Sequence, residues 1–238
     1  MKSFFLLVTL AALVLGAKAQ DIVRDAQALK RDVAAFHGIE VSGGIDLYVS
    51  QGDPAVAVSA ADSRVRDRIR TEVRDGVLHI WYEYAAGLHL DFHNLRRKAY
   101  VSARNLDQLR ASGGSDVYVK GSMDLAVMEL GLSGGSDFDG QLRADVLHIR
   151  ATGGSDVRIS GAAGKLTLEV SGGSDFHGYG LVTDQGSLEA TGGSDVYITV
   201  NKELAVHASG GSDVQYKGSG LIREIRSGGS SSVRHVSR

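Results

Sequence analysis

The sequence contains no cysteine and only one proline, Pro54, in the whole chain. A chain without cysteine cannot form disulfides, so its core and its hydrogen-bonded ladders must hold it together. Proline lacks the backbone N–H that a β-ladder uses, and its scarcity therefore favours a chain that keeps its sheet hydrogen bonds. Collagen is excluded, because it requires glycine at every third position and abundant proline.

Glycine, in contrast, is abundant: the chain contains Gly 31 times, which is about twice the average share of roughly 7%. Glycine and proline together still stay below the roughly 25–30% that marks low-complexity chains, and 43% of all residues are hydrophobic. Glycine adopts backbone conformations that other residues avoid. We therefore expect a folded chain with many sharp bends rather than a disordered one.

Residues 1–19 have the pattern of a secretory signal peptide. Lys2 supplies the positive charge, the run 4–15 is apolar, and Ala17-Lys18-Ala19 fits the cleavage rule. The apolar run is too short to cross a bilayer, and the remaining chain has no second long apolar stretch, so we expect no transmembrane segment. The alternative is a buried N-terminal helix. Since no cysteine follows, we do not expect a lipoprotein.

The charge balance argues against a nucleic-acid partner. Cleavage removes Lys2 and Lys18, which leaves 24 basic and 28 acidic side chains and changes the net charge from −2 to −4. Proteins that bind nucleic acid carry basic patches that neutralise phosphates.

A short phrase, Ser/Thr-Gly-Gly-Ser-Asp, recurs along the chain and dominates the pattern. Its copies, with deviations in the first and last, begin at Ser42, Ser112, Ser133, Thr152, Ser171, Thr191, Ser209 and Ser227. From Ser112 onward the copies follow one another at a nearly constant spacing. A constant period of about 20 residues indicates a solenoid or stacked array.

Each repeat alternates apolar and polar residues on both sides of its Gly-Gly bend, as strands do. Leu109 and Ala111 precede the bend at Gly113, and Val117 and Val119 follow it. The repeat is too short for helical solenoids or propeller blades. We therefore predict an all-β fold, a right-handed parallel β-helix (β-solenoid) with about 18–21 residues per coil and coils about 4.8 Å apart.

The N-terminal part is less regular than the rest. We expect residues 20–35 to be a leader, either a short amphipathic helix or a flexible segment. Residues 36–238 are then a single domain, with irregular first coils at 36–105 and regular coils at 106–238. Within the irregular part, residues 69–82 predict a hairpin that turns at Asp75-Gly76. In the regular part, the Ser/Thr position before each Gly-Gly is a candidate hydroxyl ladder.

Two segments resemble a known family. Residues 36–51, FHGIEVSGGIDLYVSQ, and 106–117, LDQLRASGGSDV, are similar to the family called putative auto-transporter adhesin, head GIN domain. The similarity covers about residues 36–217. It implies a β-helix-like protein that a Gram-negative bacterium exports to the periplasm, to the outer-membrane surface or into the medium. It supplies no catalytic residues.

The aspartates of the phrase are candidate cation ligands. They would form a column of Asp116, Asp137, Asp156, Asp175, Asp195 and Asp213, with Asp46 in the first copy. Neighbouring carboxylates about 4.8 Å apart repel each other by roughly 0.9 kcal/mol in water. Hydrogen bonds from backbone N–H groups of the bend or from a serine hydroxyl would offset this repulsion. Bound Ca²⁺ is the alternative, because it prefers oxygen ligands.

A second candidate metal site consists of His89, Asp91 and His93, which would share one face of a strand. Motifs of serine hydrolases, zinc proteases and P-loop enzymes are absent from the sequence. The aspartates recur identically in every coil, whereas a catalytic pair would occur once. We therefore expect no enzyme, and a β-helix carbohydrate-active enzyme remains the alternative.

A candidate binding face lies at the fifth position after the first glycine of the repeats. Its members are Tyr118, Arg158, His177, Tyr197 and Gln215. A flat polar face with aromatic side chains suits contact with carbohydrate or protein, and the alternative is a solvated face with ordinary cross-strand packing. The sequence thus predicts an exported, non-enzymatic binding protein of the cell envelope or surface without a cofactor. A purely structural envelope module is a further alternative.

Overall fold

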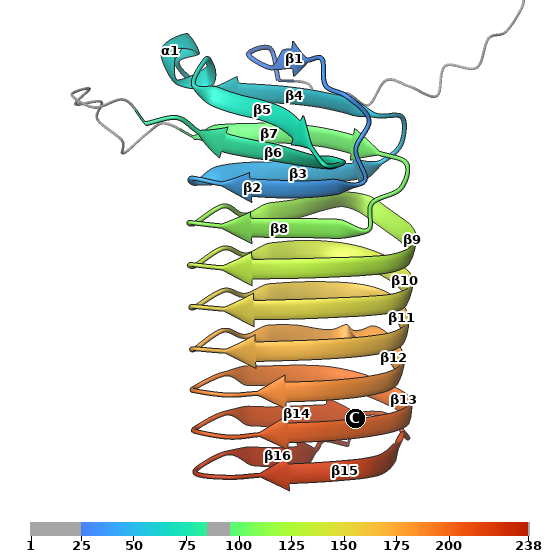
Figure 1. Ribbon diagram of the computed structural model, residues 1–238. Helices are drawn as coiled ribbons and strands as arrows, with labels where there is room; N and C mark the ends of the chain where they lie inside the picture. The colour runs from blue at the N-terminus through green and yellow to red at the C-terminus, as the bar shows by residue number, and fades with distance from the viewer. Residues whose placement is uncertain (1–24, 85–95, 238) are drawn as a thin grey trace, which may run out of the picture.

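The computed structural model describes residues 25–84 and 96–237. The predicted signal peptide at 1–19 and the candidate ligands His89, Asp91 and His93 lie outside these residues. In the described part of the chain, strands form a tall stack of two facing layers, and the one helix, α1 (Ser63–Arg66), lies at the N-terminal end (Figure 1).

Five long strands build the regular part of the stack. They are β9 (Val117–Ser133), β10 (Phe138–Thr152), β11 (Val157–Ser171), β12 (Phe176–Ala190) and β13 (Asp195–Ala208). Each strand crosses the back layer, bends, and returns in the front layer to the next Gly-Gly turn (Figure 1). All neighbours pair in parallel. In Figure 1 front strands run to the left, back strands to the right, and the chain descends, which confirms the right-handed parallel β-helix.

The last coils are divided into shorter strands. These are β14 (Asp213–Lys217), β15 (Leu221–Ser227) and β16 (Ser232–His235). β14 and β15 both pair with β13, and β16 pairs with β14, again in parallel. Ile225 is the final member of a core column and is 41% exposed. The C-terminal end of the described stack therefore leaves part of its core uncovered.

The N-terminal end differs because the chain leaves the stack and returns to it. Its strands are β1 (Leu29–Arg31), β2 (Gly38–Ser42), β3 (Ile45–Gln51), β4 (Ala55–Ala60), β5 (Ile69–Arg74), β6 (Val77–Tyr82), β7 (Arg97–Ala103) and β8 (Gln108–Ser112). β2 pairs with β8, and β3 with β9, so the first coil stacks directly on a coil that the chain forms only after β4 to β7. β6 and β7 pair with the opposite edges of β2 and β3.

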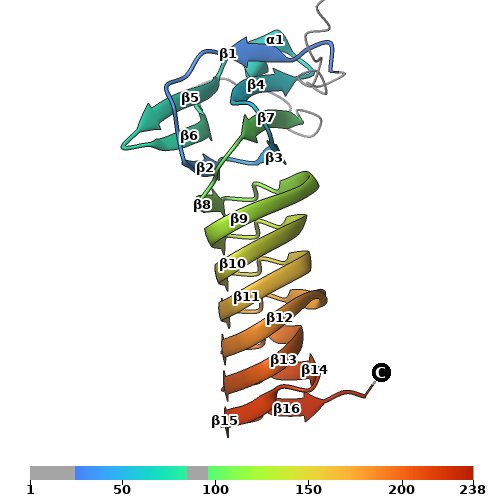
Figure 2. The ribbon, with the colours of Figure 1, turned by 90° about the vertical axis from the view of Figure 1, so that its right-hand side faces the viewer.

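Antiparallel strands close this end. β4 pairs with β7, β1 pairs with β4, and β5 forms the predicted hairpin with β6. The hairpin turns at Asp75 and Gly76, whose φ angles are 50° and 77°, and it projects to one side of the stack (Figure 2). Residues 29–31 were expected in a helix or a flexible leader. They form a strand instead, because the exposed edge of β4 offers them a hydrogen-bonding partner.

Columns of apolar side chains form one continuous core. One column runs through Leu109, Leu130, Ile149, Leu168, Leu188 and Val206, each at most 4% exposed. Because each repeat supplies one member, no single repeat could bury its apolar side chains alone.

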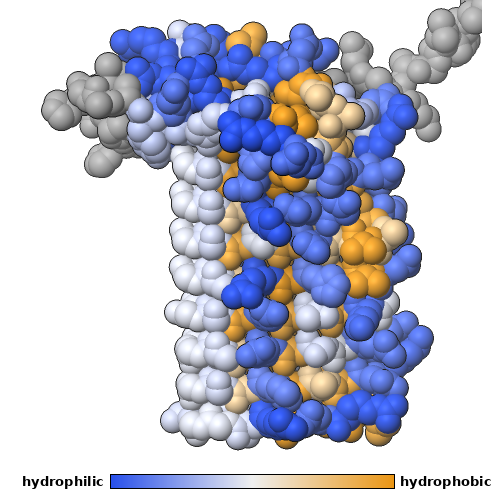
Figure 3. Space-filling model, viewed as in Figure 1, coloured by the Kyte–Doolittle hydropathy of each residue, from blue (hydrophilic) through white to orange (hydrophobic). Residues whose placement is uncertain are grey.

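The Gly-Gly turns require glycine for two reasons. In the turn at Gly172 and Gly173 both φ angles are positive, at 83° and 111°. A Cβ atom on Gly172 would also lie 3.1 Å from the backbone nitrogen of Gly153 in the preceding coil. The turns follow one another as a pale strip down one edge of the molecule (Figure 3).

The hydroxyl ladder occupies a different position from the one expected. The serine after Gly-Gly is fully buried in every copy from Ser115 to Ser212, whereas the Ser/Thr before Gly-Gly is at least partly exposed. Ser155 illustrates the contacts: its Oγ accepts from the backbone N–H of Ser136 at 3.2 Å and donates to the carbonyl of Thr152 at 3.0 Å. At the earlier position, the hydroxyl of Thr152 donates to the carbonyl of Leu132 in the preceding coil at 3.4 Å. The buried ladder lies at the later position, because the two glycines interrupt the alternation and turn the later serine inward.

Candidate binding face

The strand register places the five predicted residues of the binding face in one row. Tyr118 is followed, coil by coil, by Asp139, Arg158, His177, Tyr197 and Gln215. The row continues upward through Tyr48 and Tyr100. We call the row from Tyr100 to Gln215 the aromatic column. It lies on the outer surface of the back layer.

The upper part of the aromatic column is a stack of three tyrosines. The ring centroid of Tyr48 lies 5.3 Å from that of Tyr100 and 5.2 Å from that of Tyr118, with interplanar angles of 22° and 21°. The Nζ atom of Lys120 lies 4.8 Å from the ring centroid of Tyr48. Tyr100 donates a hydrogen bond to Asp25 at 2.9 Å, and burial together with this bond raises the pKa of Tyr100.

The lower part is a second aromatic cluster. His177 stacks on Tyr197 at 5.3 Å and 7°, and Tyr179 meets Tyr197 edge-on at 5.5 Å. Tyr179 also donates to Oε1 of Gln215 at 3.3 Å, and its ring centroid lies 4.3 Å from the Nζ atom of Lys217. This cluster therefore repeats the upper arrangement, in which aromatic rings are accompanied by a lysine ammonium group.

Three tyrosines of this face were not among the predicted residues. Tyr48 lies at the fifth position after Gly43, so the same spacing could have found it. Tyr100 follows no Gly-Gly phrase and joins the column only through its pairing with Tyr48. Tyr179 lies where the register between β11 and β12 shifts, and such irregularities redirect side chains.

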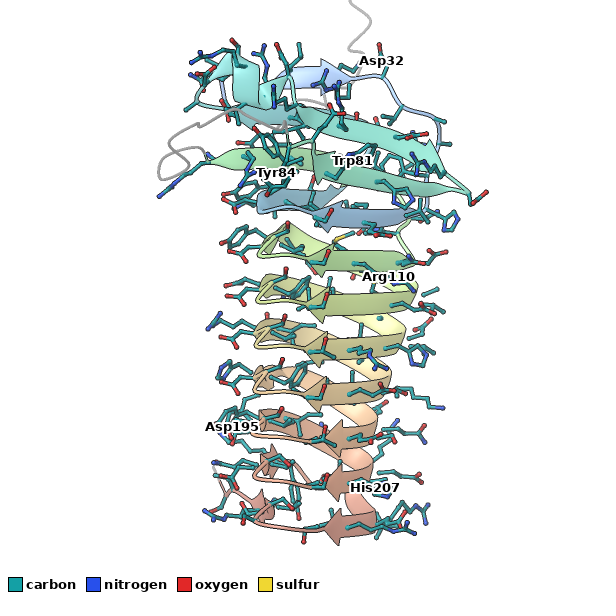
Figure 4. The ribbon with its side chains drawn as sticks, turned by 60° about the vertical axis from the view of Figure 1, so that its left-hand side comes forward. Asp32, Trp81, Tyr84, Arg110, Asp195 and His207 are labelled. Carbon is teal, nitrogen blue, oxygen red and sulfur yellow. The ribbon has the colours of Figure 1, made fainter. Side chains whose placement is uncertain are left out.

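The predicted aspartates form a second row beside the aromatic column, which we call the carboxylate row. Its members are Asp46, Asp116, Asp137, Asp156, Asp175, Asp195 and Asp213, and Figure 4 shows the side of the stack where Asp195 points outward. Within this row, Oδ1 of Asp116 accepts from the backbone N–H of Asp137 at 3.1 Å, and Oδ1 of Asp137 accepts from that of Asp156 at 3.1 Å. The donor is thus a backbone N–H group of the next coil, not one of the aspartate's own Gly-Gly bend.

The second carboxylate oxygen faces the aromatic column. Arg158 contacts Oδ2 of Asp156 at 3.1 Å and Oδ2 of Asp137 at 4.0 Å. Toward the lower end, burial and the charges of Asp175 and Asp213 raise the pKa of Asp195. At the upper end, burial and the charge of Asp116 raise the pKa of Asp46. The cations Lys98, Arg96 and Arg97 act against the raised pKa of Asp46, and Asp213 at the lower end accepts a hydrogen bond from the hydroxyl of Ser232.

No cluster of three or more His, Asp or Glu side chains in residues 25–84 and 96–237 is placed to hold a metal ion. Calcium binding by Asp116, Asp137, Asp156, Asp175, Asp195 and Asp213 stays a prediction. In the part of the chain that the structure describes, no helix is long and apolar enough to cross a membrane.

Residues 35–220 match the model of the family described as putative auto-transporter adhesin, head GIN domain. The chain belongs to this family. Since the match covers most of the sequence, the head GIN domain includes both the irregular first coils and the regular stack.

Solved structures share the fold at low sequence identity. A putative adhesin from Bacteroides fragilis superposes with a TM-score of 0.80 at 17% identity, over 88% of this chain and 96% of the other. A putative adhesin from Parabacteroides distasonis gives 0.69 at 22%, over 88% and 96%. A putative lipid binding protein from the same species gives 0.65 at 18%, over 90% and 98%. None of the curated proteins matches the chain.

The front layer of this head GIN domain has a different outer surface. Several of its charged side chains pair with opposite charges in neighbouring coils: Arg150 with Glu169 at 2.7 Å, and Arg110 with Glu129 at 3.8 Å. Arg110 and His207 lie on this side of the stack, away from Asp195 (Figure 4). The aromatic column therefore distinguishes the back layer.

Proposed function

We propose that this head GIN chain is an exported, non-enzymatic surface-binding module that uses the aromatic column to bind carbohydrate or protein. The observation that carries the proposal is the concentration of five of the eight tyrosines, together with His177, on one outer surface. Tyrosine combines a large apolar ring with a polar hydroxyl and few rotatable bonds, and it is therefore enriched in binding surfaces. Export is supported by the signal-peptide pattern of residues 1–19.

The carboxylate row supports a non-enzymatic role. Its members recur identically, and Asp116, Asp137 and Asp175 each accept a backbone hydrogen bond that links two coils. Glycosidases require two carboxyl groups in different roles, usually with a raised pKa on one of them. Asp46 and Asp195 have a raised pKa, but each occupies the same position of its turn as every other member, so the row contains no pair of carboxyl groups placed for two different roles.

The test is binding of the chain from Gln20 onward to arrays of glycans and of surface-protein peptides. We expect binding to one array, and a loss of about tenfold or more in the variant Tyr118→Ala/Tyr197→Ala, since tyrosines at the centre of an interface dominate binding energies. The matched control is Arg150→Gln/Glu169→Gln on the front layer, which should bind like the parent.

Each other outcome points to an alternative. Release of reducing sugar from a bound glycan would favour a β-helix carbohydrate-active enzyme. Absence of binding to either array would favour a purely structural envelope module. Export is tested separately by sequencing the N-terminus of the secreted protein, which we expect to begin at Gln20.

A further inference from the structure

The aromatic column and the carboxylate row run side by side along the axis of the stack. Both repeat once per coil, about every 4.8 Å. A ligand that contacts several members of both rows must therefore be linear and lie along this axis. A compact ligand would contact only one or two coils.

The charges of this face favour a cationic ligand. Asp139 in the aromatic column adds an eighth carboxylate to the seven of the row. The basic side chains near the two rows are Arg96, Arg97, Lys98, Lys120, Arg158, Lys217 and Arg234, and the first three lie near Asp46 at the upper end. From Asp137 downward, six carboxylates face only Arg158, Lys217 and Arg234 among the described residues, so negative charge prevails in the lower part of the face. Burial and a neighbouring aspartate also raise the pKa of Tyr48, Tyr118 and Tyr197, which shows that the rings lie in the field of the carboxylates.

Two ammonium groups already occupy the aromatic rings. The Nζ atom of Lys120 lies 4.8 Å from the ring centroid of Tyr48 and 6.0 Å from that of Tyr118. The Nζ atom of Lys217 lies 4.3 Å from that of Tyr179. Cation–π attraction holds such groups within about 6 Å of a ring centroid. Lysine side chains are flexible, so an external ammonium group can replace them.

We infer that the ligand is a lysine-rich, extended polypeptide segment that lies along the aromatic column. Its ammonium groups replace those of Lys120 and Lys217 on the rings and contact the outward Oδ2 atoms of the carboxylate row. The inference rests on the proposed function and adds the ligand class. A polypeptide is favoured over an amino-sugar polymer, because the groups seen on the rings are lysine side chains with flexible alkyl stems.

The probe is a labelled synthetic peptide that alternates lysine and serine, measured by fluorescence anisotropy with the chain from Gln20 onward. We expect it to bind, with affinity falling as salt rises, because exposed charge pairs are screened. The same peptide with acetylated lysines, and one with glutamate in place of lysine, should not bind. Neutral glycans and chitosan oligomers are tested as competitors.

Two sets of variants separate the contribution of the carboxylate charges to peptide binding from that of the lysines on the rings. Asp175→Asn/Asp195→Asn keeps the amide oxygen as an acceptor but removes two charges, and should weaken peptide binding about fivefold. Lys120→Met/Lys217→Met removes the internal competitors and should tighten binding about two- to fivefold. Arg150→Gln/Glu169→Gln on the front layer is the matched control and should leave the affinity unchanged.

Three results would overturn the inference. Weaker binding in Lys120→Met/Lys217→Met would show that these lysines contact the ligand. Binding of chitosan oligomers without binding of the peptide would assign the face to an amino-sugar polymer. Binding of neutral glycans that Tyr118→Ala/Tyr197→Ala abolishes, without peptide binding, would leave the proposed function intact and refute the lysine-rich segment. If no probe or array ligand binds, both proposals fail.

Discussion

The front and back layers are made by the same strands, yet their outer surfaces differ. In the front layer, charges of both signs share one row: Arg150 is followed by Glu169, with which it pairs at 2.7 Å, and Glu169 by Glu189. In the back layer, like residues follow one another: aspartates in one row and tyrosines in three consecutive coils of the other. Opposite charges within one row partly cancel, whereas repeated like charges add. Repetition therefore gives the back layer a surface of aspartates and aromatic rings, which is the surface that we propose for ligand binding.

The largest loss of stability is expected from a substitution in a Gly-Gly turn, because each such turn connects the front layer to the back layer. Gly172→Val should lower the free energy of unfolding by about 3 kcal/mol or more, because the residue has a positive φ and its side chain would press on the preceding coil. The control is Gly154→Ala, because Gly154 has a similar φ of 79° and an added Cβ there meets no atom within 4 Å. It should cost only about 1–2 kcal/mol for its backbone conformation. Urea unfolding of both variants measures the difference, and equal losses would contradict the role of close packing.

A smaller effect is expected from the buried hydroxyl ladder that joins the coils beneath the turn. Ser155→Ala removes the acceptor of the Ser136 N–H, and should cost about 1–3 kcal/mol because that donor stays buried. Thr152→Ala, at the partly exposed position, should cost less than about 1 kcal/mol. Thermal unfolding of the two variants compares them, and a larger loss for Thr152→Ala would place the ladder on the wrong serine.

The contrast between the layers can be measured with two double-mutant cycles. Tyr48 and Tyr118 in the back layer should show a coupling of about 0.5–1.5 kcal/mol that salt changes little, as for aromatic pairs. Arg150 and Glu169 in the front layer should show about 0.2–1 kcal/mol, and less at high salt. If both cycles respond equally to salt, the two layers do not differ as described.

The smallest effect concerns Asp195. Burial and the charges of Asp175 and Asp213 raise its pKa in the folded protein, while His177 acts in the opposite direction. A carboxyl group with a raised folded pKa holds its proton more tightly when folded, so its ionisation costs stability as the pH rises through that pKa. Asp195→Asn should therefore stabilise the protein at neutral pH, by less than about 1 kcal/mol, and the gain should vanish at acid pH. Unfolding measured across pH tests this sign.

The regular coils could be predicted because the sequence features that define each coil lie within a single repeat. Each repeat carries its own alternation and its own Gly-Gly bend, and a constant period is enough to align Tyr118, Arg158 and His177 in one row. The N-terminal end could not be predicted in this way. Its first coil stacks on one that is distant in the sequence, and Tyr100 joins the column only through the pairing of β7 with β3.

The binding face shows the same division at the level of single residues. Tyr197 and Gln215 each lie at the fifth position after the first glycine of their repeat, and the strand register places them next to each other. Tyr179 does not lie at this fifth position, and it joins the face because the register between β11 and β12 shifts there. The inward direction of Ser155 also required the structure, since two consecutive positive φ angles break the alternation that the sequence suggests.

The sequence by itself determined the coil, its period, the core columns and the place of the aspartates, because a repeat of nearly constant length must bury the same positions each time. The tertiary structure decided how the N-terminal strands close the stack, which serine joins the coils, and which tyrosines meet. These features depend on contacts between segments far apart in the chain, and a sequence pattern within one repeat does not predict such contacts.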